Sequence, residues 1–364
     1  MKNPFIYTQT VTDEAFCNRE KERSDFKDFI NNSVNVLLYS HRKLGKTSLI
    51  RSVFKELKNV TPIYIDLFGT TSTDDFIKNL LKGISEIYSK PQQLAQLLKD
   101  KIKSFNVQFS FNLETGAPLA FPAFIPKDKS PALSEVFSVL ESMSKNKNMV
   151  VAFDEFQEVA NYKNESFEKK MRSIIQRHNK IAYIFSGSQR HILFEMFTDY
   201  KRAFYKQAQN YPLQPIDTEH YIVWIKKIYK KANRRITDKQ IIDIVNRCEN
   251  YPVYIQEFFY RLWNKKNVTS SAIEEIESDI IKSREAEFIS AWDSLSLNQK
   301  KTMKLIVLSG GENIYSADNL MKVGFTSASQ VKVALDKLQK RNFVLKNGHY
   351  AVQDVFLKKY IRIL

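Results

Sequence analysis

The stretch that decides the fold is Ser40-His41-Arg42-Lys43-Leu44-Gly45-Lys46-Thr47, which directly follows the apolar run Val34-Asn35-Val36-Leu37-Leu38-Tyr39. A strand that ends in such a loop and then opens a helix directs backbone N–H groups and the positive end of the helix dipole at one point, where phosphates bind. We expect that helix to run from Thr47 through Phe54. The pattern is a phosphate-binding loop (P-loop), although Ser40 stands where the usual pattern has its first glycine.

The residue types in this loop suit a nucleoside triphosphate. Lys46 is expected to reach the β- and γ-phosphates as a point charge, and the Thr47 hydroxyl to join the shell of a Mg²⁺ ion. A chance match in a basic loop is the alternative, but the strand before and the helix after supply the required context. The predicted nucleotide-binding residues are Ser40, His41, Arg42, Lys43, Leu44, Gly45, Lys46, Thr47 and Ser48.

Two acids follow a second apolar run about a hundred residues later. Asn148 to Phe153 is expected to be a central strand, and Asp154-Glu155 stands at its carboxyl end. This arrangement is typical of a Walker B motif, in which Asp154 would hold Mg²⁺ through water and Glu155 would polarise the attacking water. The acids lie beside the P-loop if the two strands are near neighbours in the sheet. A solvated strand end is the alternative.

Further candidates surround these motifs. Ser186 and Ser188 end the next predicted strand, where a hydroxyl could bond the γ-phosphate or the attacking water; alternatively, Ser188 caps the helix from Gln189 to Met196. Arg172, Arg190 and Arg202 could each stabilise transition-state charge, in cis or from a neighbouring subunit, and Arg202 is the preferred candidate. Phe16 and Arg19 could pack near the adenine, or be a core aromatic residue and a surface charge.

The composition indicates a globular chain. Of its 364 residues 43% are hydrophobic, which is enough for a sizeable core. No segment approaches the length of about eighteen apolar residues needed to span a membrane, and Met1 to Phe5 lacks a signal-peptide core, so we expect a soluble cytoplasmic protein without membrane contacts. Two cysteines, Cys17 and Cys248, exclude a disulfide framework and a Cys-rich metal site, so no metal beyond nucleotide-bound Mg²⁺ is implied.

The order of the predicted elements divides the chain into three parts. Residues 1–215 alternate strands with helices, which predicts an α/β fold with a parallel sheet covered on both faces, and a hairpin is inserted at about 105–122 around the turn Glu114-Thr115-Gly116. Residues 216–290 read as a helical lid domain: Thr237 has capping-box spacing to Gln240, and Pro252 starts an apolar helix.

Residues 291–364 predict a winged helix. Ser327 is the expected N-cap of a helix from Ala328 to Arg341, and Asn347-Gly348 is the turn of a following hairpin. Half of the net charge of +16 lies from residue 298 onward, because this segment contains ten Lys and two Arg but only four acidic residues. Such clusters favour polyanions, although a solvated face of an interaction domain is an equally good interpretation. The cations expected to contact DNA are Lys332, Lys337, Lys340 and Arg341.

Together these segments resemble the archaeal-type ATPase family of prokaryotic P-loop proteins, in the STAND branch of the AAA-like ATPases. The likeness spans nearly the whole chain and implies an ATPase core, a lid and a winged helix, with Lys46, Thr47, Asp154 and Glu155 in the roles above, Ser186 or Ser188 as the γ-phosphate sensor, and Pro252 as the proline of a G-x-P element near the nucleotide. Asn250 departs from the glycine of that element. The residues that carry the likeness are Phe16 to Glu20, Arg42 to Ser48, Asp154-Glu155-Phe156-Gln157, Ser186-Gly187-Ser188, Arg202 to Tyr205 and Asn250-Tyr251-Pro252.

The sequence thus favours an ATP- and Mg²⁺-dependent molecular switch with slow, regulatory hydrolysis, in which the nucleotide controls the winged helix. Two alternatives remain: an ATP-dependent DNA-binding protein, and a non-hydrolysing scaffold with a structural nucleotide. The partners that these functions allow are ATP or ADP, DNA, a protein effector and a second copy of the chain.

Overall fold

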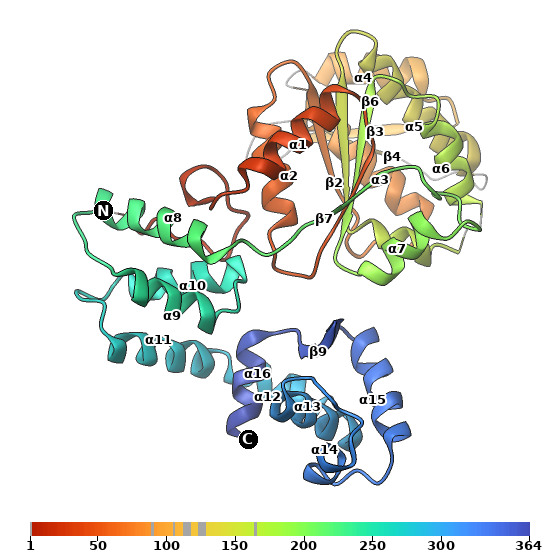
Figure 1. Cartoon of the computed structure of the whole chain (residues 1–364). Coiled ribbons are helices and arrows are strands. Elements are labelled where there is room, and N and C mark those ends of the chain that lie inside the picture. Colours follow the sequence, from red (N-terminus) through yellow and green to blue (C-terminus); the bar gives the residue numbers. More distant parts are fainter. Residues whose placement is uncertain (1, 89–90, 105, 112–117, 123–128, 164–165) are drawn as a thin grey trace. The chain divides into compact units, whose positions relative to one another are not determined.

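The computed structural model describes residues 2–88, 91–104, 106–111, 118–122, 129–163 and 166–364. The chain forms two compact units (Figure 1). We call Ile6–His220 with Tyr251–Val253 the α/β unit, and Met1–Phe5, Tyr221–Asn250 and Tyr254–Leu364 the helical unit. Across the described ranges, no helix combines the length and the apolar character that crossing a bilayer requires.

A five-stranded parallel sheet forms the centre of the α/β unit, as predicted. Its order is β2-β5-β6-β1-β7. Strand β6 therefore lies between β1, which leads into the P-loop, and β5, which leads into the acidic pair, and the carboxyl ends of all three meet at one edge. The strands are β1 (Val36–Tyr39), β2 (Thr61–Asp66), β5 (Met149–Asp154), β6 (Ile181–Gly187) and β7 (Gln209–Pro212).

Alternate residues of the strands enter two separate hydrophobic cores, one on each face of the sheet. Val36, Leu38 and Ile184 pack with α1 (Glu20–Asn31) and α2 (Lys46–Glu56). Leu37, Phe153 and Phe185 face the other core, and Figure 1 shows helices on both sides of the sheet. The helices of the second core are α3 (Thr73–Ser85), α4 (Pro91–Lys101), α5 (Lys129–Ser144), α6 (Phe167–Ile175) and α7 (Arg190–Thr198).

One α-helix and one strand of this unit were not predicted from the sequence. Helix α4 was not predicted, although Leu94 and Leu98 recur at helical spacing and are buried. Strand β7 was missed because it is a polar, largely exposed edge strand that ends in a proline, and so lacks the apolar run of a buried strand. The predicted hairpin is present as β3 (Val107–Phe111) paired antiparallel with β4 (Pro118–Pro122), whereas its expected turn at 114–116 lies outside the described residues.

The helical unit begins with four helices and a short connecting one. Thr237 and Gln240 form the predicted capping box at the start of α9, and Pro252 is the first residue of α10 as expected. These elements are α8 (Thr218–Lys231), α9 (Asp238–Arg247), α10 (Pro252–Leu262), α11 (Ser270–Ser283) and α12 (Glu285–Asp293). The first turn of α8 and the first two residues of α10 belong to the α/β unit.

The rest of the helical unit is the predicted winged helix. Helix α15 buries Val331 and Leu335, and the β8–β9 pairing is centred on Gly348. Ser327 is the N-cap of α15 as predicted, although its side chain makes no cap bond. The elements are α13 (Leu297–Ser309), α14 (Ala317–Lys322), α15 (Ala328–Lys340), β8 (Val344–Asn347), β9 (His349–Val352) and α16 (Val355–Ile363).

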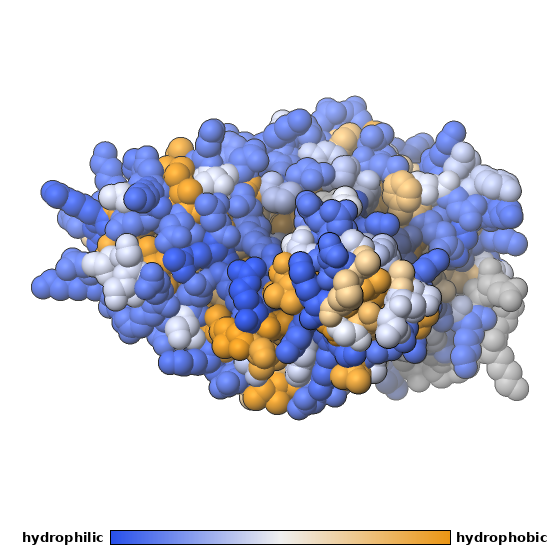
Figure 2. All heavy atoms as spheres, turned by 60° about the horizontal axis from the view of Figure 1, so that its bottom comes forward, coloured by the Kyte–Doolittle hydropathy of each residue, from blue (hydrophilic) through white to orange (hydrophobic). Residues whose placement is uncertain are grey.

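One glycine is required by close packing in this domain. A Cβ atom on Gly311 would lie 1.6 Å from the backbone oxygen of Tyr350, and its φ of +82° already favours glycine. The Tyr350 N–H donates to the Gly311 carbonyl, which fixes the loop after α13 against β9. On the face drawn in Figure 2 the surface is mainly hydrophilic, with hydrophobic residues gathered in small groups between hydrophilic ones.

Candidate nucleotide-binding site

The P-loop connects the carboxyl end of β1 to α2 through two left-handed residues, Lys43 (φ +68°) and Gly45 (φ +89°). Gly45 is the N-cap of α2, and no side chain caps this helix end. The first N–H groups of an α-helix have no partner inside the helix, and the helix dipole adds positive potential there. The start of α2 is therefore suited to bind an anion.

Ser40 does not disturb this loop. It is not among the residues with positive φ, so the backbone at this position does not need a glycine. Its side chain is buried, donates to the His41 carbonyl oxygen (2.9 Å) and accepts from Nζ of Lys46 (3.3 Å). The serine thus orients the P-loop lysine.

Lys46 lies close to both predicted acids. Its side chain is buried, with only 7% of the residue exposed. Burial lowers the pKa of the Lys46 ammonium, and the charges of Glu155 and Asp154 oppose that change by stabilising the cation. The structure thus brings the P-loop lysine and the two acids to the same place.

Asp154 is the centre of a hydrogen-bonded cluster at the edge of the sheet. Its carboxylate accepts from the Thr47 hydroxyl at 2.7 Å and from the Ser186 hydroxyl at 2.5 Å. Ser186 reaches Asp154 because β6 lies directly beside β5. A hydroxyl and a carboxylate at this spacing are the hard oxygen ligands that Mg²⁺ prefers, so Thr47 and Asp154 fit such an ion.

Tyr64 of β2 is a member of this cluster that the sequence did not reveal. Its hydroxyl donates to Asp154 at 2.5 Å, and burial together with the Asp154 charge raises the pKa of the phenol, which stays protonated. The guanidinium of Arg51 lies 3.7 Å from the centre of the Tyr64 ring. A tyrosine inside an apolar strand reads as a core residue, so only the strand order identifies it as a neighbour of Asp154.

Glu155 is held in place by its neighbours at the end of β6. Its backbone is left-handed (φ +52°), an uncommon state for a glutamate and one that often marks a functional position. The carboxylate accepts from the hydroxyl of Ser188 (2.9 Å) and from the amide of Gln157. Gly187 leaves room for this amide, since a Cβ atom there would lie 1.9 Å from the side-chain oxygen of Gln157.

Ser188 therefore does not have the helix-capping role that was the alternative interpretation. The N-cap of α7 is Gln189, without a side-chain cap bond, and the Ser188 hydroxyl is directed to Glu155 instead. It also accepts from Nε of Arg42 at 3.3 Å. Ser188 thus connects the P-loop to the second acid.

Among the candidate arginines, Arg190 contacts the P-loop. Its Nη1 lies 3.1 Å from Nε2 of His41. Burial, and then the charges of Arg190 and Lys46, lower the pKa of His41 to about 4, so the imidazole is neutral and accepts from Arg190. Arg202, the candidate preferred from sequence, is bound instead by Glu168 (2.5 Å) and Glu195 (3.4 Å). Its catalytic role stays a prediction.

The segment before α1 contacts the P-loop. Arg19 is buried, donates to the Leu44 carbonyl oxygen at 3.4 Å and forms an ion pair with Glu22. Phe16 packs against the core under α1 and α2, and Ser48 accepts from the Val11 N–H at 3.2 Å. The position of Phe16 and Arg19 relative to an adenine stays a prediction.

The backbone conformation of Asn250 explains how it can replace the glycine of the G-x-P element. Its φ is +58°, in the left-handed region that glycine adopts most easily and asparagine next. The asparagine therefore keeps the backbone turn that leads into Pro252 and α10. A contact of Pro252 with nucleotide stays a prediction.

Comparisons with known proteins agree with this architecture. A family model described as a probable winged helix domain matches residues 286–363. No curated protein matches the sequence. A Walker-type ATPase of Pyrococcus abyssi is similar in structure, with a TM-score of 0.70, 19% identity and 99% of each chain covered.

Two proteins of Aeropyrum pernix are more distant. ORC2, in a complex with ADPNP and ADP, has a TM-score of 0.51 and 12% identity over 100% of this chain and 98% of its own. ORC1, in a complex with DNA, has a TM-score of 0.50 and 11% identity over 97% and 96%. Fold and likeness together define the class: a P-loop ATPase fold like that of the ORC proteins, followed by a C-terminal winged-helix domain.

Proposed function

We propose that this chain is an ATP-binding and ATP-hydrolysing switch of the AAA-like class, in its STAND branch, and that its nucleotide state controls the winged helix. The observation that carries the proposal is the convergence of Lys46, Thr47, Asp154 and Glu155 at one edge of the sheet. The fold of P-loop ATPases supports it.

Each residue of the cluster has a separate task. Lys46 and the N–H groups at the start of α2 would bind the phosphates, and Thr47 and Asp154 would hold Mg²⁺, which neutralises phosphate charge when bound. Glu155 orients and polarises the attacking water, and Ser188 and Gln157 fix the direction of its carboxylate. Ser186 keeps Asp154 in position.

The helical unit contains contacts that would carry a movement of α10 to the winged helix. The Tyr254 hydroxyl of α10 donates to Asp354, the N-cap of α16, at 2.6 Å. Arg284 pairs with buried Glu257 of α10 at 2.6 Å and lies 3.9 Å from the same Asp354. We propose that residues 216–290 form a lid and that residues 291–364 form the domain that responds to it. Pro252 is the first residue of α10, the lid helix that contacts the winged helix through Tyr254. ATP favours one arrangement only through contacts that differ between the two states.

Release of phosphate from ATP by the purified protein in the presence of Mg²⁺ tests the enzymatic part of the proposal. Measurable turnover supports it. Tight ATP binding without any turnover would instead identify a scaffold with a structural nucleotide.

We expect Arg190→Ala to lower kcat by at least about tenfold, because Arg190 is the arginine that contacts the P-loop and an arginine near the γ-phosphate stabilises transition-state charge. The matched control is Arg202→Ala, which breaks partly exposed ion pairs worth less than about 1 kcal/mol. Steady-state turnover at saturating ATP decides between them. A large loss in Arg202→Ala with normal turnover in Arg190→Ala would reverse the assignment.

DNA binding is a second candidate function, favoured by the exposed face of α15. Lys332, Lys337 and Lys340 are exposed there, and within the described residues they make no ion pair. Arg341, the fourth cation expected to contact DNA, donates instead to the backbone and side chain of Ser294. The three lysines are therefore the better DNA candidates.

Replacing these three lysines with alanine is expected to weaken binding of duplex DNA and to flatten its salt dependence. Each lost phosphate contact reduces the slope of log K against log salt by roughly 0.9, so the slope should fall by about 2 to 3. Fluorescence anisotropy at several salt concentrations measures both quantities. Affinity and slope equal to those of the unchanged protein would exclude α15 as a DNA-binding surface.

A further inference from the structure

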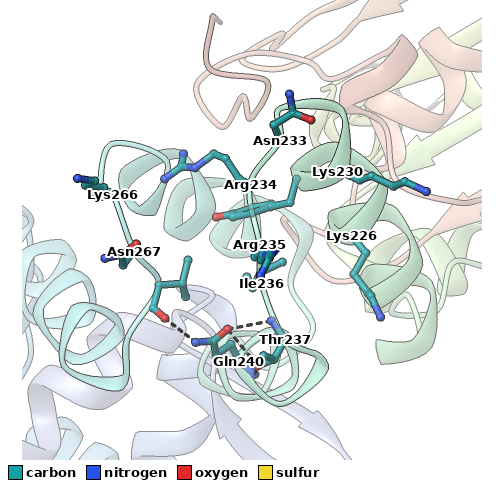
Figure 3. Close-up of a pocket in the computed structure, with 12 residues that line it drawn as sticks. Lys226, Lys230, Asn233, Arg234, Arg235, Ile236, Thr237, Gln240, Lys266 and Asn267 are labelled. Carbon is teal, nitrogen blue, oxygen red and sulfur yellow. Dashed lines mark hydrogen bonds between the residues drawn. The ribbon is translucent and has the colours of Figure 1, made fainter.

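The helical unit contains a basic pocket that the proposed ATPase function does not use. It is formed by the end of α8, the loop from α8 to α9, and the loop between α10 and α11, and it encloses about 1080 Å³ (Figure 3). All of its lining residues belong to the helical unit. Nothing in the roles assigned to Lys46, Asp154 and Glu155 involves it.

The lining carries a strong positive charge. It includes five cations, and no carboxylate is among the described residues that line the pocket; the cations are Lys226, Lys230, Arg234, Arg235 and Lys266. Lys226 is paired with Asp238 at 2.8 Å. Lys230, Arg235 and Lys266 are exposed and form no ion pair within the described ranges. Uncompensated cations around a concave surface attract anions.

Arg234 gives the pocket a fixed charge. Its guanidinium donates to the backbone oxygens of Trp263 (2.5 Å) and Lys265 and lies 4.6 Å from the Trp263 ring centre. Carbonyl partners satisfy the N–H groups without neutralising the cation. Gln240 donates to the Val268 carbonyl at 2.5 Å and bonds Thr237, so it joins the two loops of the pocket. The basic surface is therefore held in place before any ligand arrives.

Tyr229 supplies an independent sign of a ligand. It lines the same pocket, is only 1% exposed, and its hydroxyl has no hydrogen-bond partner in the described part of the chain. A buried hydroxyl without a partner is costly, and such groups in native proteins require an explanation. An acceptor oxygen brought by a ligand, or by water bound with it, would satisfy this hydroxyl.

The distribution of the cations indicates the kind of anion. In Figure 3, Lys266 lies on one side of the pocket, Lys226 and Lys230 lie on the opposite side, and Arg234 and Arg235 lie between them. A single phosphate group requires donors that converge on one point, whereas these cations are spread along the rim. A spread of this kind suits a chain of phosphates. We infer that the pocket binds the phosphate backbone of a nucleic acid, as a contact separate from α15.

The test is the triple variant Lys230→Glu, Arg235→Glu and Lys266→Glu in the full chain. These side chains are exposed and unpaired in the described residues, so the fold should persist, which a thermal melt verifies. With labelled single-stranded and duplex oligonucleotides as probes, we expect at least tenfold weaker binding to one or both. The slope of log K against log salt should fall by about 2 to 3.

The matched control is Lys58→Glu, Lys145→Glu and Lys147→Glu, three exposed lysines of the α/β unit whose replacement changes the net charge equally. It should retain most of the affinity. The inference is wrong if both triple variants lose affinity equally, if the pocket variant binds like the unchanged protein, or if the unchanged protein binds neither oligonucleotide. It is also wrong if the pocket variant loses binding of tripolyphosphate alone, since the pocket would then take a small polyphosphate. ATP turnover should be normal in the pocket variant, so a failure of the ATPase proposal is seen separately.

Discussion

Lys46→Ala is expected to abolish ATP binding at micromolar nucleotide. Lys46 is buried beside Glu155 and Asp154, and its ammonium would bond the β- and γ-phosphates. Two charge-assisted hydrogen bonds at about 1.5–3 kcal/mol each amount to roughly 3–6 kcal/mol, or about a 10²- to 10⁴-fold loss of affinity. Isothermal titration with ATP and Mg²⁺ measures the change directly.

Lys58→Ala is the control for this experiment, because it removes an exposed lysine just after α2 and should bind ATP normally. A Lys46→Met variant, which keeps the length of the buried side chain, separates loss of binding from loss of folding. ATP affinity within a factor of three of the unchanged protein in both Lys46 variants would contradict the P-loop assignment.

Glu155→Gln is expected to bind ATP tightly and to hydrolyse it at least about a hundredfold more slowly, since a positioned general base contributes roughly 10²–10⁴-fold. The glutamine oxygen can still accept the hydrogen bond from Ser188, so the site keeps its shape. Single-turnover hydrolysis of radiolabelled ATP, with retained ATP analysed after gel filtration, measures both effects.

Glu158→Gln is the matched control, because Glu158 lies in the 3-10 helix Phe156–Asn161 that directly follows Glu155. Burial, and then the charge of Glu155, raise the pKa of Glu158, but no task in catalysis is assigned to it. Its turnover should stay within about threefold of the unchanged protein. If Glu155→Gln hydrolyses ATP at the normal rate, the role of Glu155 as the base is wrong.

The sequence predicted most reliably those features that depend on a few neighbouring residues. The P-loop, the acids at the carboxyl end of β5 and the capping box at Thr237 are local patterns, and each lies where it was expected. The two sheet faces were also predictable, because fully buried parallel strands appear as continuous apolar runs. These patterns sufficed for the fold class and for the order of the described strands and helices from β1 to β6, apart from α4.

What the sequence missed depends on contacts between distant segments. Tyr64 joins the Asp154 cluster only because β2 lies beside β5, and the role of Ser188 follows from the backbone direction at Glu155. Arg190 and Arg202 could not be separated until His41 and Glu168 were located as their partners. Ser40 appeared to be a weakness of the P-loop, whereas its hydroxyl bonds Lys46.

A crystal structure of the Glu155→Gln variant grown with ATP and Mg²⁺ tests the central claim most directly. The account predicts a triphosphate at the start of α2, with Nζ of Lys46 on the β- and γ-phosphates and the metal between the Thr47 hydroxyl and the Asp154 side. Nucleotide bound anywhere else, or a metal that neither Thr47 nor Asp154 approaches directly or through water, would contradict it.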